Sequence, residues 1–159
     1  MASQDNGYLG SQLYKIRHSA AHILAQAMLE RFPEAMLAIG PPIADGFYYD
    51  FQLPVSPSDE DIAWVEARMK AIIASGVSFS MREVSADEAL AQFKDQPFKR
   101  ELIEDLVHGR VDENGEEIAA PASTLTFYTQ DSFTDLCRGP HVANSREIDP
   151  EAVNITYKK

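Results

Sequence analysis

The stretch SQLYKIRHSAAHILAQAMLER, residues 11–31, predicts the element around which the rest of the chain folds. It contains neither glycine nor proline, is rich in alanine and leucine, and stops before Pro33, a pattern typical of one long helix. Because helical residues advance by about 100° each, its side chains separate into stripes. The stripe that we expect to face the core comprises Leu13, Ile16, Ala20, Leu24 and Ala27. A second stripe, on the opposite side, comprises His18, His22, Ala25 and Leu29, and we interpret it as one wall of a cleft.

The remaining chain alternates short strands and helices. We predict two strands around the Pro and Gly residues at 38–53, the second of them over 46–53. A half-buried strand is predicted over 77–84, with Val77, Phe79 and Met81 inward. Two further strands are predicted over 124–130 and just before Cys137. We predict helices over 58–76, 85–93 and 97–109, and a turn at Asn114 and Gly115. This order indicates an α+β fold, a mainly antiparallel sheet packed with helices, with the long N-terminal helix lining a cleft between two lobes. Residues 1–10 are expected to be a disordered leader, and residues 11–159 one domain.

Composition narrows the function classes. The 159 residues are 45% hydrophobic, enough for a real core, and a single cysteine excludes an internal disulfide. No stretch approaches the roughly 20 apolar residues of a membrane span and no export signal is seen, so we expect a cytoplasmic protein without membrane contact. The net charge of −11 disfavours broad electrostatic binding of nucleic acid and leaves local contact with one end of it.

Two short pairs carry the chemistry. His18 and His22 stand four residues apart, which places both on one helix face, and Cys137 precedes His141 by four residues. Three imidazoles and one thiol would complete a tetrahedral zinc site if the two pairs met. The alternatives are packed or exposed helix histidines and a buried inert thiol. His108, beside Gly109 at a helix C-terminus, is better explained by the helix dipole.

Four segments in order resemble the editing domain of bacterial threonyl-tRNA synthetase. They are RHSAAHILAQAM at 17–28, GPPIADGFYYDF at 40–51, PFKRELIEDL at 97–106 and DLCRGPH at 135–141. Alanyl-tRNA synthetase and its free-standing editing relatives share both pairs but typically carry Gly-Gly-Thr between the last Cys and His, where this chain has Arg-Gly-Pro. The resemblance runs from about Tyr14 to Val142, and residues 144–159 match the family poorly. The family's ubiquitin-like and aminoacylation domains are absent, so we expect an excised fragment or a stand-alone protein.

The resemblance implies an aminoacyl-tRNA ester hydrolase that removes serine wrongly attached to threonine tRNA. Lys99 with His18 would position or activate water, and His22, Cys137 and His141 would line the same pocket. Asp135 would accept hydrogen bonds from the substrate's α-ammonium, and Tyr49 would lie near the ribose and the substrate side chain. The partner would be the 3′ end of tRNA(Thr) carrying serine, and the protein would act as a monomer.

The same resemblance implies editing without metal. Two alternatives stay open. One is a zinc-dependent alanyl-type trans-editing hydrolase, with zinc at His18, His22, Cys137 and His141; the positive charge of Arg138 beside the cysteine disfavours a dication there. The other is a non-catalytic docking module of the same fold.

Overall fold

The computed structural model describes residues 11–40, 42–43, 45–109 and 124–158. The expected leader and the predicted turn at Asn114 and Gly115 lie outside these residues. The helices are α2 (Gln12–Arg31), α3 (Asp59–Ser75), α4 (Ala86–Gln92), α5 (Pro97–Val107) and the 3-10 turns η1 (Ser145–Glu147) and η2 (Pro150–Ala152). The strands are β1 (Met36–Leu37), β2 (Pro42–Ile43), β3 (Gly46–Phe47), β4 (Phe51–Gln52), β5 (Phe79–Val84), β6 (Leu125–Gln130) and β7 (Phe133–Leu136). The predicted α+β class is confirmed, whereas the cleft between two lobes stays a prediction.

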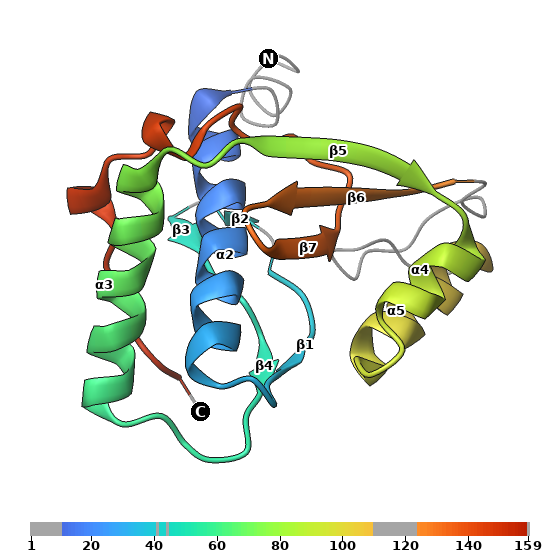
Figure 1. Cartoon of the computed structure of the whole chain (residues 1–159), viewed down its shortest axis with the longest axis horizontal. Helices are drawn as coiled ribbons and strands as arrows, with labels where there is room; N and C mark the ends of the chain where they lie inside the picture. The colour runs from blue at the N-terminus through green and yellow to red at the C-terminus, as the bar shows by residue number, and fades with distance from the viewer. Residues whose placement is uncertain (1–10, 41, 44, 110–123, 159) are drawn as a thin grey trace.

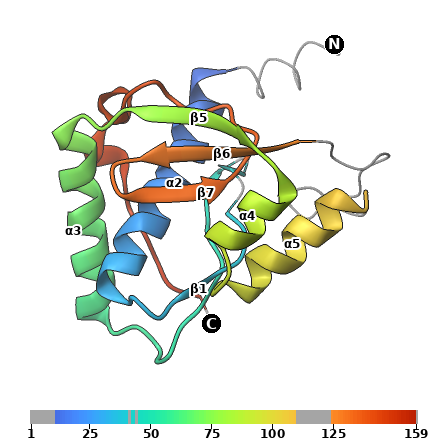
Figure 2. The ribbon, with the colours of Figure 1, turned by 45° about the vertical axis from the view of Figure 1, so that its right-hand side comes forward.

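Helix α2 begins at the cap Ser11, whose side chain accepts a hydrogen bond from the backbone N–H of Tyr14, and it is covered on more than one side. Figures 1 and 2 show α3 running beside it, with the strands β5 to β7 and then α4 and α5 on the other side. Both predicted stripes therefore contribute buried residues, His18 and His22 among them. Leu13 was wrongly placed in the core: it is 47% exposed, because it lies in the first turn, where the helix projects beyond its neighbours.

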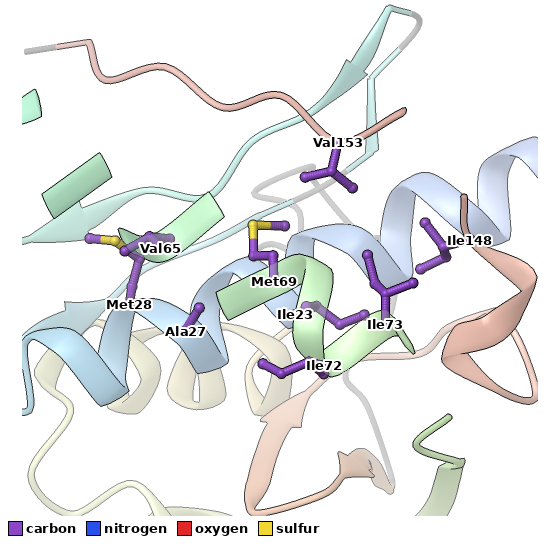
Figure 3. Packing of buried hydrophobic residues seen from close by; sticks show 9 residues of the cluster. All are labelled: Ile23, Ala27, Met28, Val65, Met69, Ile72, Ile73, Ile148 and Val153. Carbon is purple, nitrogen blue, oxygen red and sulfur yellow. The ribbon is translucent and has the colours of Figure 1, made fainter. Parts of the chain in front are cut away.

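Helix α3 matches its sequence signals closely. Ser58 and Asp61 form a reciprocal capping box at its start, and Gly76 ends it with a positive φ of 76°. Its inward face packs against α2, and Figure 3 shows this apolar cluster. The cluster comprises Ile23, Ala27, Met28, Val65, Met69, Ile72, Ile73, Ile148 and Val153. Because Ile148 and Val153 belong to it, the segment after residue 144 is part of the core.

The main sheet has the order β5-β6-β7, with both pairs antiparallel. The expected alternation over residues 77–84 is confirmed for Val77 and Phe79, which are half-buried, and it is wrong for Met81, which is 58% exposed. Residues 80–83 are all exposed. β5 is an edge strand of the sheet, so within the described residues only one of its sides pairs with another strand of the sheet. The central strand β6 does alternate, with Leu125 and Phe127 buried.

The strand predicted over residues 46–53 is divided in two. β3 pairs with β2 and β4 pairs with β1, both antiparallel. The partner segment is itself divided, with β1 ending at Leu37 and β2 beginning at Pro42. Between the two short strands lies Tyr49, whose side chain is buried against Gly40.

Helices α4 and α5 form a second apolar cluster with the sheet. Ser85 caps α4 by accepting a hydrogen bond from the backbone N–H of Glu88, and Pro97 begins α5 as predicted. Leu102, Ile103 and Leu106 of α5 pack against Phe127 and Leu136 of the sheet in this cluster. The packing fixes the first turn of α5, and with it Lys99, against the end of β7.

None of the helices in the described ranges is both long and apolar enough to cross a membrane.

Truncating Met69 tests the α2 and α3 core. Met69 has no exposed surface, so Met69→Ala removes buried methylenes and leaves a cavity, and we expect the free energy of unfolding to fall by about 2–5 kcal/mol. The matched control is Met81→Ala on the exposed edge strand, which should change it by no more than about 0.5 kcal/mol. Equal losses in the two variants, measured by urea unfolding, would contradict the packing described here.

Candidate functional site

The three predicted site histidines form one cluster of rings. His18 and His22 project from the same face of α2, with ring centroids 5.3 Å apart. The His141 ring, which the chain brings back after β7, stacks on His18 at 4.1 Å and lies tilted against His22 at 4.2 Å. The two sequence pairs, more than 100 residues apart along the chain, therefore meet in space.

Cys137 lies at the centre of this cluster. Its Sγ is 3.1 Å from Nε2 of His18 and 3.3 Å from Nε2 of His141. The backbone N–H of Gly139 also donates to this sulfur, at 3.1 Å. Gly139 has a φ of 77°, and a Cβ added there would lie 2.5 Å from the Tyr128 hydroxyl oxygen, so the loop that returns His141 to the cluster requires glycine.

A buried ion pair borders the cluster. The Nζ of Lys99 lies 2.8 Å from Oδ1 of Asp135, and each residue is only 2% exposed. Oδ1 also accepts from the backbone N–H of Leu136 at 2.8 Å, and Oδ2 accepts from the Tyr49 hydroxyl at 2.6 Å. His22 completes this environment, with Nε2 3.9 Å from Oδ2.

Sequence reasoning without the resemblance would have left Lys99 in solvent. A signal was nevertheless present in the sequence. Lys99 stands three, four and seven residues before Leu102, Ile103 and Leu106, so it shares the apolar face of α5 that packs on the sheet. A lysine on such a stripe is buried with the stripe and needs an anionic partner, which Asp135 supplies.

Electrostatics keep the imidazoles of His22 and His141 neutral. Burial, and then the neighbouring His18 and Lys99, hold the pKa of His22 well below its ordinary value. Burial, followed by His22 and His18, likewise lowers the pKa of His141. Burial, and then the Asp135 carboxylate, raise the pKa of Tyr49 well above its ordinary value, so its hydroxyl stays protonated and donates.

Six of the seven predicted site residues line one pocket. Its cavity volume is about 10 Å³, roughly the space that one water molecule takes. The lining comprises His18, His22, Ile39, Gly40, Tyr49, Lys99, Asp135, Leu136 and Cys137. His141, the seventh, lies against His18 and Cys137 and is not one of the lining residues. Nδ1 of His22 is buried and has no hydrogen-bond partner among the described residues.

The cluster suits a metal in the type of its donors. One ligand atom from each of His18, His22, Cys137 and His141 lies within 4.8 Å of the other three. A closed tetrahedral zinc site would bring such atoms to about 3.5 Å from one another, given metal distances of about 2.0 Å to nitrogen and 2.3 Å to sulfur. The types of the donor atoms therefore fit zinc, whereas the distances between these atoms are longer than in a closed zinc site. The expected absence of metal stays a prediction.

Comparison with known proteins supports the resemblance. Residues 125–159 match the family model described as "Threonyl and Alanyl tRNA synthetase second additional domain". The chain is 46% identical over 144 residues to the threonine-tRNA ligase of Treponema pallidum (strain Nichols), a match that covers 91% of this chain and 22% of that protein. It is 43% identical over 146 residues to the threonine-tRNA ligase of Borrelia duttonii (strain Ly), covering 92% of this chain and 23% of the relative.

The resemblance to threonyl-tRNA synthetase is therefore confirmed, and the chain spans less than a quarter of the length of these relatives. One expectation is corrected: residues 144–159 do match the family, since the family model extends through residue 159. The segment forms only two short 3-10 turns, so its sequence has no periodic pattern to recognise. Its Ile148 and Val153 are nevertheless buried in the core cluster.

Removing the buried cation should destabilise the protein strongly. Lys99→Met leaves the Asp135 carboxylate buried without its counter-charge, and we expect the free energy of unfolding to fall by about 3–5 kcal/mol. The matched control is Lys70→Met, which removes a partly exposed ion pair with Glu66 at 3.8 Å and should cost no more than about 0.5 kcal/mol. If chemical denaturation found the two losses alike, the ion pair would not be buried as described.

Acid should weaken the fold through the buried imidazoles. The pKa values of His22 and His141 are lower in the folded chain than the ordinary value near 6.5, so the unfolded chain binds more protons below about pH 6.5. Stability is then complete above that pH and falls on acidification, by up to about 1.4 kcal/mol per pH unit for each histidine.

Urea unfolding between pH 7.5 and pH 5 measures this slope. His141→Gln should flatten it, whereas His108→Gln, at a side chain 56% exposed, should leave it as in the unaltered protein. A free energy of unfolding that does not change over this range would refute neutral burial of the two rings.

Proposed function

We propose that this chain hydrolyses the ester that joins serine to the 3′ end of threonine tRNA, and that it does so as a cytoplasmic monomer. The observation that carries the proposal is the pocket in which a buried lysine and carboxylate pair meets the imidazoles of His18 and His22, of which His22 has a lowered pKa. Such a site can hold an amino group, a developing negative charge and a proton acceptor together. Similarity to threonine-tRNA ligases supports tRNA as the partner.

Asp135 would bind the α-ammonium of the seryl group. A carboxylate offers about four acceptor positions, and three of those on Asp135 are taken by Lys99, the Leu136 N–H and the Tyr49 hydroxyl. The remaining position is on Oδ2, and Asp135 lines the pocket. One N–H of the ammonium would donate there, which fixes the substrate relative to the imidazoles.

Lys99 and His18 would act on the water and the carbonyl. The ammonium of Lys99 has three donors and gives one to Asp135, and another would donate to the oxygen that becomes negative during attack. His18 and His22 line the same pocket, and the neutral His22 is suited to accept a proton and pass it to the leaving ribose oxygen. Cys137 and His141 would hold His18 in place through the contacts described above.

Serine differs from threonine by one methyl group, which a single binding step discriminates by only about 1–3 kcal/mol. Tyr49 would supply the wall that excludes threonine. Its ring stacks on Phe51 at 4.9 Å, its hydroxyl is bound to Asp135, and a Cβ on Gly40 would lie 2.2 Å from it. A ring held on three sides cannot move aside for an extra methyl.

One observation favours a second candidate, a zinc-dependent alanyl-type editing hydrolase. The four donors His18, His22, Cys137 and His141 suit zinc in type, and they would be the ligands. Bound zinc would supply a water of lowered pKa. A non-catalytic docking module is disfavoured, because docking gives no reason to bury an ion pair beneath a pocket.

A deacylation assay with purified protein, carried out with and without chelator, tests these candidates. We expect release of serine from seryl-tRNA(Thr) above the rate in buffer, retention of threonyl-tRNA(Thr), and no effect of chelator. Lys99→Met should lower the rate at least about 100-fold through loss of oxyanion stabilisation, and Lys70→Met should not change it.

Three results would count against the proposal. If the protein hydrolyses neither seryl-tRNA(Thr) nor seryl-tRNA(Ala), both enzyme candidates are excluded and the docking module remains. Chelator-sensitive hydrolysis of seryl-tRNA(Ala) would favour the zinc enzyme. Equal hydrolysis of the seryl and threonyl esters would refute the steric role of Tyr49.

A further inference from the structure

Ser19 touches the cluster but has no part in the function proposed so far. It follows His18 on α2 and has no exposed surface. Its Oγ lies 3.0 Å from the backbone nitrogen of Val142 and 3.0 Å from Nδ1 of His141. In the part of the chain that the structure describes, these are the two hydrogen-bond partners of the hydroxyl.

Two backbone groups fix the direction of the hydrogen bonds around Ser19. The N–H of Val142 can only donate, so the Ser19 oxygen accepts from it. At the other end of the cluster, Nδ1 of His18 lies 3.1 Å from the carbonyl oxygen of Pro140, which can only accept. His18 therefore carries a proton on Nδ1.

The sulfur of Cys137 connects these two ends. In a neutral ring protonated on Nδ1, the Nε2 of His18 is an acceptor, and it faces Sγ at 3.1 Å. The thiol has one hydrogen, so if that hydrogen goes to His18, the Nε2 of His141 at 3.3 Å must donate to the sulfur. If the thiol proton has instead moved to Nε2 of His18, the resulting imidazolium and Nε2 of His141 both donate to the thiolate, and the His141 proton is again on Nε2.

His141 then accepts at Nδ1, and the Ser19 hydroxyl supplies the hydrogen. The reverse arrangement, with Nδ1 of His141 donating to Ser19, would leave the Ser19 hydrogen without an acceptor among the described residues. It would also direct two imidazole lone pairs at a sulfur with one hydrogen to give.

We propose that Ser19 is a positioning residue that holds His141 as the tautomer protonated on Nε2, so that the hydrogen of Cys137 is directed to His18. The chain of bonds runs from the Val142 N–H through Ser19, His141, Cys137 and His18 to the Pro140 carbonyl. Its effect on catalysis rests on the proposed hydrolysis, whereas the tautomer does not. A metal bound at Nε2 of His141 would demand the opposite tautomer, with Nδ1 donating to Ser19.

Nitrogen NMR of the histidine rings tests the tautomer directly. In chelator-treated, ¹⁵N-labelled protein near pH 7.5, the Nδ1 of His141 should show the shift of an unprotonated ring nitrogen and Nε2 that of a protonated one. His141→Gln identifies the signals. A proton on Nδ1 of His141 in the unaltered protein would overturn the proposal without any further variant.

Substitution separates positioning from packing. Ser19→Ala should mix or reverse the tautomers of His141 and lower kcat for seryl-tRNA(Thr) about tenfold with a smaller change in KM. Ser19→Thr, which keeps the hydroxyl, should restore the single tautomer. The control is Ser145→Ala, because Ser145 is equally buried, accepts from the Val77 N–H and donates to the Ile73 carbonyl, all away from the site.

An unchanged His141 tautomer in folded Ser19→Ala would refute the role of Ser19. If the spectra agree with the proposal but the unaltered protein hydrolyses no ester, the proposed function fails and the positioning of His141 by Ser19 stands.

Discussion

The ion pair between Lys99 and Asp135 is the constraint on which the rest of the site depends. Two charges that are each 2% exposed must be fully satisfied by the protein, because desolvation of an unpaired charge costs several kcal/mol. Lys99 comes from α5, Asp135 from β7, and the Tyr49 hydroxyl that completes the carboxylate comes from the segment between β3 and β4. One electrostatic requirement thus brings three distant segments to the same pocket.

The apolar clusters supply the stability that this polar arrangement does not. Buried neutral histidines and a buried ion pair contribute little net stability themselves, so the fold relies on the α2 and α3 cluster and on the packing of α5 against the sheet. Helix α2 serves both purposes. One side carries Ile23 and Ala27 of the core, and the other presents His18 and His22 to the pocket. Substitutions on α2 are therefore expected to change stability and chemistry together.

The sequence correctly predicts those helices whose ends are marked by capping residues or proline. The caps Ser58 and Gly76 gave the bounds of α3, and Pro97 gave the start of α5. It failed where the outcome depends on neighbours: β5 has an alternating sequence, yet as an edge strand its Met81 is exposed. For the site, the resemblance supplied residue roles, but only folding shows that Cys137 meets His18 across 119 positions. Ser19 was missed because a serine inside a helix has no distinctive pattern, and its partners lie more than 100 residues away.

The central claim is that the pocket beside Asp135 binds the seryl ester in a metal-free cluster. A crystal structure with serine joined through an amide to the 3′ position of adenosine tests it most directly, because the amide resists hydrolysis and keeps the ammonium and carbonyl of the substrate. The account predicts the ammonium within hydrogen-bond distance of Oδ2 of Asp135 and the carbonyl facing Lys99 and His18. Binding of the ligand outside the pocket, or a metal ion held by Cys137 and the three histidines, would contradict it.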